Sequence, residues 1–167
     1  MRQGLGLCRT MGAEIWTPSY LALLAEACEK AEQEEEGLSL VDEALEVAHN
    51  SGQPLSEARL YMLKGTLTLQ KEFQVQGSTF QVENPQSAFH NPQLETEACF
   101  LKSIEIARQQ QAKSLELRAA TSLARLWQQQ GKKTEAHKLL SDVYNWFTEG
   151  FDTKDLQEAK ALLEELA

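Results

Sequence analysis

The residues of this chain that could do chemistry are few and scattered. The histidines, His49, His90 and His137, have no second histidine at the spacing of a metal-binding helix. Gly4-Leu5-Gly6 has no third glycine after it and no strand before it, so close helix packing explains it better than phosphate binding. Serine, cysteine and histidine never fall into a spacing that suggests a nucleophile with its base. The sequence predicts a non-enzymatic protein with no metal and no cofactor.

The cysteines Cys8, Cys28 and Cys99 are odd in number, contain no CxxC, and each lies in an apolar helical pattern. This favours buried free thiols, as in a reducing cytoplasm, over a disulfide or metal ligands. No apolar run approaches the roughly 18 residues that a membrane span needs, and the N-terminus has no apolar signal-peptide core. We therefore expect a cytoplasmic protein.

The composition favours helices. The 167 residues include only 4 prolines and 9 glycines, beside much Ala, Leu, Glu and Gln. The 16 basic and 25 acidic residues give a net charge of −9, which argues against nucleic acid and anionic membranes as partners. The charge is uneven, because residues 26–46 hold nine acids and one base, whereas residues 101–138 hold eight bases and three acids.

Small and large residues recur at a fixed spacing. Leu21-x2-Leu24-Ala25-x2-Cys28 is followed by Gly37, Val41 and Ala44, and Ala120-x2-Leu123-Ala124-x2-Trp127 is followed in the same register by Ala136, Leu140 and Val143. A third copy starts at Tyr61 and is lengthened by an insertion. The step from Ala44 to Tyr61 and from Ser103 to Ala120 is 17 residues. This 40-residue period is typical of stacked antiparallel helix pairs.

The repeat predicts an all-α, right-handed superhelical solenoid in a single domain over 1–167. Its expected parts are a lone second helix at 1–11, pairs at 18–51, 55–111 and 114–149, an inserted loop at about 72–92, and a terminal capping helix at 153–166.

The spacing resembles the tetratricopeptide repeat, W-x2-L-G-x2-Y followed by A-x3-F. The stretches YLALLAEACEKAEQEEEGLSLVDEALE and WFTEGFDTKDLQEAKALLEEL look like the C-terminal tetratricopeptide region of large bacterial signalling proteins. Such proteins carry a nucleotide cyclase or another output domain and a AAA-like/STAND ATPase before these repeats. The resemblance implies that the chain is a fragment of such a protein, with Met1 an internal methionine.

The resemblance implies a protein-interaction and regulatory module, whose partner is a protein, a peptide or the parent's own ATPase or cyclase domains. The alternative is a small-ligand sensor that binds a metabolite in the repeat groove. First helices line the concave face of such solenoids. The groove residues expected on this face are Arg59, Met62, Thr66, Leu69, Arg118, Thr121, Arg125 and Gln128.

Two expectations concern contacts of this array. Arg59, Arg118 and Arg125 are expected either to receive an acidic peptide or carboxylate, or to pair internally with Glu26, Glu116 or solvent. Apolar residues of the first predicted helix also lead us to expect a weak homodimer through the N-terminal end.

Overall fold

The computed structural model describes residues 16–50, 56–77 and 92–167. Within these ranges all regular structure is helical and no strand occurs, which confirms the all-α prediction for this part of the chain. The helices are α2 (Thr17–Lys30), α3 (Glu34–Asn50), α4 (Glu57–Gly77), α5 (Pro92–Gln109), α6 (Lys113–Gln129), α7 (Lys133–Tyr144) and α8 (Lys154–Leu166).

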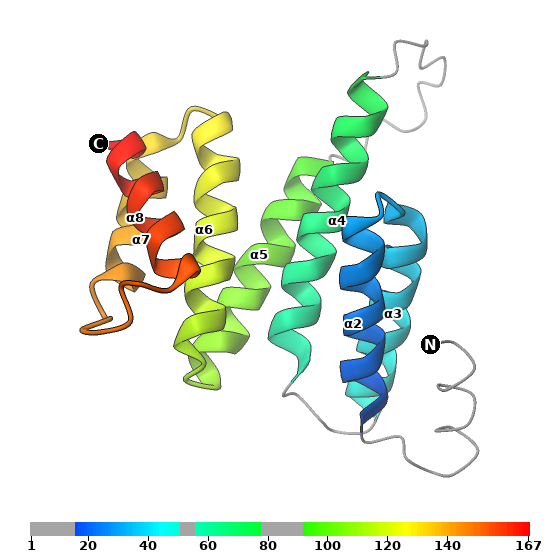
Figure 1. Ribbon diagram of the computed structural model, residues 1–167. Helices are drawn as coiled ribbons and strands as arrows, with labels where there is room; N and C mark the ends of the chain where they lie inside the picture. The colour runs from blue at the N-terminus through cyan, green and yellow to red at the C-terminus, as the bar shows by residue number, and fades with distance from the viewer. Residues whose placement is uncertain (1–15, 51–55, 78–91) are drawn as a thin grey trace. The chain divides into compact units, whose positions relative to one another are not determined.

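The chain divides into two compact units, Met1–Cys99 and Phe100–Ala167, and α5 runs across the boundary between them. In the first unit α2, α3 and α4 pack against one another (Figure 1). In the second unit α6, α7 and α8 likewise pack against one another (Figure 1). Besides its part of α5, each unit thus contains a helix pair and the helix that follows it, which is α4 in the first unit and the predicted terminal capping helix α8 in the second.

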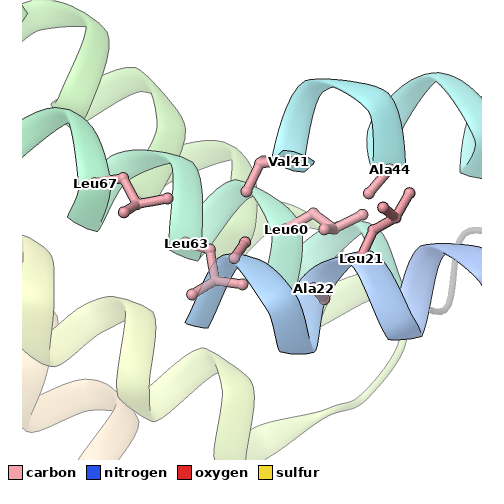
Figure 2. Close-up of a cluster of buried hydrophobic side chains, with 8 residues drawn as sticks. Leu21, Ala22, Val41, Ala44, Leu60, Leu63 and Leu67 are labelled. Carbon is pink, nitrogen blue, oxygen red and sulfur yellow. The ribbon is translucent and has the colours of Figure 1, made fainter. Parts of the chain in front are cut away.

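The core of the first unit combines small and large side chains from all three helices. Figure 2 shows Val41 and Ala44 of α3 beside the leucines of α4, with Leu21 and Ala22 of α2 completing the cluster. The alanines let the helices approach closely, and the leucines fill the space between them. The alternation found in the sequence is therefore a packing pattern.

Gly37 lies where α3 packs closely against α2 and α4. A Cβ atom at this position would lie 3.0 Å from both Cδ atoms of Leu67 and 3.2 Å from Cβ of Cys28. The equivalent position in the second unit, 99 residues later, is Ala136, which is fully buried. The first unit therefore packs more tightly at this position than the second.

The turns inside the two helix pairs share one geometry. Glu32, with φ 55°, lies in the α2–α3 turn, and Gly131, with φ 79°, lies 99 residues later in the α6–α7 turn. The N–H of Gln33 donates to Cys28 O at 3.0 Å, and the N–H of Lys132 donates to Trp127 O at 2.8 Å. These are helix ends closed by a left-handed residue.

The start of the predicted insertion is wrong by about five residues. The sequence predicts a loop from about residue 72, but α4 continues to Gly77. Residues 72–76 contain no proline or glycine, so nothing in them stops the helix. The other end is close to the prediction, because α5 begins at Pro92. The predicted helix at 1–11 lies outside the described residues.

Among the described residues, no helix combines the length and the apolar character that crossing a bilayer requires.

Candidate partner-binding faces of α4 and α6

The eight predicted groove residues belong to two helices in different units. Arg59, Met62, Thr66 and Leu69 lie on α4, and the remaining four lie on α6. Residues three, four and seven apart share one side of a helix, so each helix carries its four residues as one stripe.

The α4 stripe is partly buried, and its arginine is already paired. Arg59 Nε donates to Glu26 Oε1 of α2 at 2.8 Å, and the two side chains are 31% and 27% exposed. Met62 is buried, and the Thr66 hydroxyl donates to the Met62 carbonyl oxygen at 3.1 Å. Between the two expectations for Arg59, the structure shows the internal pair with Glu26.

The α6 stripe is more open, and its partners come from α8. Arg125 Nη2 donates to Glu158 Oε2 at 3.2 Å, and Gln128 Nε2 donates to Glu165 Oε2 at 3.3 Å. Arg118 Nε lies 3.8 Å from Asp155 Oδ2, a loose pair. Arg118 and Arg125 keep 46% and 50% of their side-chain surface exposed. Thr121 is buried, and its hydroxyl donates to Leu117 O.

Glu158 receives two cations. Burial by itself would raise the pKa of this carboxyl. The hydrogen bonds from Arg125 and from Lys154, the latter at 3.4 Å, outweigh burial and hold the pKa below its ordinary value. The carboxylate on α8 is therefore charged when it faces the α6 stripe.

The pairs between first helices occur at the same register in both units, with the charges exchanged. Glu26 and Arg59 are 33 residues apart, as are Arg125 and Glu158. A shift of 99 residues takes Glu26 to Arg125 and Arg59 to Glu158, so the acidic and basic positions of the pair are exchanged between the two units. The α8 partners of Arg118 and Arg125 were not predicted from the sequence, although the 99-residue shift between the two units is visible in it.

A second charged cluster lies at the start of α6. Glu116 is 3% exposed, and it receives Arg108 Nε and Lys113 Nζ, each at 2.7 Å. Burial would raise the pKa of Glu116, but the two cationic hydrogen bonds lower it below the ordinary value. The sequence predicts Glu116 only as a partner for the arginines of the groove, whereas its partners are Arg108, in the last turn of α5, and Lys113, the first residue of α6.

Aromatic side chains gather where α7 leads into α8. Trp146 is 58% exposed and Phe151 46% exposed. The Trp146 ring meets Phe147 edge-on at 5.2 Å between centroids, and Lys113 Nζ lies 5.5 Å from its centroid. The sequence does not predict that Trp146 and Phe151 are exposed, because aromatic residues near the end of a helix are usually expected to be buried in the core.

The cysteines and histidines do not form a site among the described residues. Cys28 and Cys99 are free and buried, as predicted, and burial raises the pKa of Cys99. Cys8 and His90 lie outside the described ranges. Within those ranges no group of three or more His, Cys, Asp or Glu side chains is placed to hold a metal ion.

Comparisons of the chain with protein-family models, with curated proteins and with solved structures gave no match.

Proposed function

We propose that this chain is a non-catalytic protein-interaction and regulatory module of a larger bacterial signalling ATPase or nucleotide cyclase, built as a tetratricopeptide-like solenoid. The observation that carries the proposal is the repeated unit: two sets of three helices share turn geometry and the register of their ion pairs. Repeat arrays bury contacts only between neighbours and offer extended surfaces to partners.

The α6 stripe supports an acidic partner. A guanidinium has five N–H donors, and Arg125 donates one hydrogen bond to Glu158. Arg118 Nε lies 3.8 Å from Asp155 Oδ2, which is too long for a strong hydrogen bond, so the Arg118 guanidinium keeps more of its donors available than Arg125 does. Because both side chains are about half exposed, a peptide carboxylate can bind them from the solvent side while α8 stays in place.

The test measures how tightly this chain binds the ATPase and cyclase domains that we expect to belong to the same parent protein. Arg118→Glu with Arg125→Glu should weaken binding at least about tenfold, the loss of about 1.4 kcal/mol expected for charge-assisted contacts. This variant also breaks the pairs with α8. A second variant adds Asp155→Arg and Glu158→Arg, which restores those pairs with the charges exchanged.

The restored variant separates the two roles of the arginines. Binding should stay weak in it, since the face offered to the partner now lacks its arginines at the original positions. If binding returns with the α6–α8 pairs, the arginines only position α8. If neither variant changes binding, the stripe is not the partner site.

A further inference from the structure

The second unit exposes a tryptophan beside two cations. Trp146 lies just after the end of α7 and is 58% exposed. Lys113, the first residue of α6, places its Nζ atom 5.5 Å from the centroid of the Trp146 ring. Arg108, in the last turn of α5, is joined to Lys113 by the carboxylate of Glu116, which accepts a hydrogen bond of 2.7 Å from each cation. We call Arg108, Lys113 and Trp146 the Trp146 patch.

The indole of Trp146 is ordered by its neighbours. The backbone N–H of Trp146 donates to Val143 O at 3.3 Å, and that of Phe147 donates to Tyr144 O at 3.1 Å, so tight turns continue past the end of α7. The Phe147 ring meets the indole edge-on, at an interplanar angle of 86°. An exposed aromatic side chain that is already ordered loses little conformational entropy when a partner covers it.

The two cations of the patch share one counter-charge. The single negative charge of Glu116, which is 3% exposed, faces two positive charges, so the group keeps a net charge of +1. Glu105, three residues before Arg108, is paired with Lys102 at 2.9 Å. The hydrogen bond from Arg108 to Glu116 uses Nε, and the Arg108 side chain is 52% exposed. Its two terminal amino groups are therefore accessible to a second carboxylate.

Acidic residues around the tryptophan limit the charge that a partner can bring. Asp142 and Glu149 are exposed, four residues before and three residues after Trp146. They repel a partner that carries a run of acidic residues. The charges therefore favour a partner with a single carboxylate, placed at Arg108.

We propose that the Trp146 patch binds a peptide segment of another protein in which an aromatic side chain neighbours a single Asp or Glu. The aromatic ring covers the exposed part of the indole, and the carboxylate binds the terminal amino groups of Arg108. Tryptophan and arginine are the residue types that most often dominate binding at protein interfaces. The patch shares no residue with the α6 stripe, so it does not rest on the proposed function.

The experiment selects binders to the full chain from a displayed library of random peptides of about twelve residues, and keeps those that do not bind Trp146→Ala. The retained peptides should carry an acidic residue next to an aromatic one or one position away from it. Replacing that acid by its amide should raise the dissociation constant, measured by calorimetry, at least about tenfold. Arg108→Lys keeps a cation beside Glu116 but removes the terminal amino groups, so the same peptide change should then cost less than about twofold.

Two controls separate the patch from other surfaces. Trp16→Ala removes a tryptophan that is 63% exposed in the first unit, and it should leave the binding of these peptides unchanged. Arg118→Glu with Arg125→Glu should change it by no more than about threefold, the effect of distant charge alone. A larger loss would place the peptides on the α6 stripe and overturn the proposal.

Two further results would overturn it. One is a library that yields no peptide dependent on Trp146. The other is an acid-to-amide change that costs the same in the unaltered chain and in Arg108→Lys, because the carboxylate would then bind elsewhere. Circular dichroism checks that Trp146→Ala folds, and the comparison with Arg108→Lys decides the outcome even if that variant loses helix.

Discussion

Glu116 shows how a single buried charge holds a helix junction together. Its carboxylate is 3% exposed and takes hydrogen bonds from Arg108 and Lys113. Glu116→Gln should lower the free energy of unfolding at pH 7 by about 1–3 kcal/mol, since two cations lose their buried partner. Urea titration followed by circular dichroism measures this. Glu105→Gln is the control: Glu105 is 53% exposed and pairs with Lys102, so its loss should cost less than about 0.5 kcal/mol.

The same residue predicts a dependence on pH. The pKa of Glu116 is lower in the folded chain than its ordinary value of 4.5. Its stabilising effect is therefore complete above pH 4.5 and is lost as the pH falls through the lowered value. The stability difference between the unaltered chain and Glu116→Gln should shrink between pH 7 and pH 3. A difference that stays constant over this range would contradict the charged pairing.

Residue-level predictions fail where a side chain has a choice of partner. Threonine is a favoured N-cap residue, and Thr153 stands at the N-cap of α8 with an extended backbone. Its hydroxyl donates to Gly150 O at 2.7 Å instead, so it closes the preceding turn. Sequence spacing gives the position of such a residue, but competition between nearby acceptors decides its hydrogen bond.

At the scale of the element, the turns that follow α2 and α6 predict opposite changes in stability for substitutions at two equivalent positions, Glu32 and Gly131. Glu32 has φ 55°, where a side chain is strained, and Glu32→Gly should stabilise the chain by about 0.5–1 kcal/mol. Gly131 has φ 79° and open space around it, so Gly131→Ala should destabilise by about 1 kcal/mol through backbone strain alone.

The control for these turn variants is Glu46→Gly, at an exposed position inside α3. There the same change should destabilise by about 1 kcal/mol, because glycine costs entropy in a helix. Thermal melts of the three variants check the signs. A melting temperature lowered by Glu32→Gly would show that its side chain makes a contact worth more than the strain.

The helices themselves were largely predictable, because small and large residues alternate at helical spacing and recur along the chain. The predicted pairs at 18–51 and 114–149 contain α2 with α3 and α6 with α7 to within one residue at their starts. The end of α4 was not predictable from composition. Residues 72–77 were grouped with the polar insertion that follows them, yet their helix propensity is sufficient to extend α4 to Gly77.

At the scale of the whole molecule, the candidate site was the least predictable feature. The stripe positions on α4 and α6 follow from the repeat, but their ionic partners depend on which neighbouring helix carries the opposite charge. Arg59 finds Glu26 on the preceding first helix, whereas Arg125 finds Glu158 on the following one. Periodicity fixes which positions meet, and the individual residue then determines the sign of the charge.

Self-association belongs to the whole molecule, and three exposed side chains of the first unit are its candidates. Trp16, the N-cap residue of α2, is 63% exposed, and Tyr20 and Leu23 are 48% and 46% exposed on the same side of this helix. Burying them against a second copy removes apolar surface from water, so we expect a weak homodimer. Leu23→Asp should weaken it at least about tenfold, because a carboxylate opposes apolar burial. Leu94→Asp, at a leucine that is 64% exposed on α5, is the control and should leave the dimer intact. Light scattering over a concentration series measures the dissociation constants, and an unaltered chain that stays monomeric at high micromolar concentration would contradict the prediction.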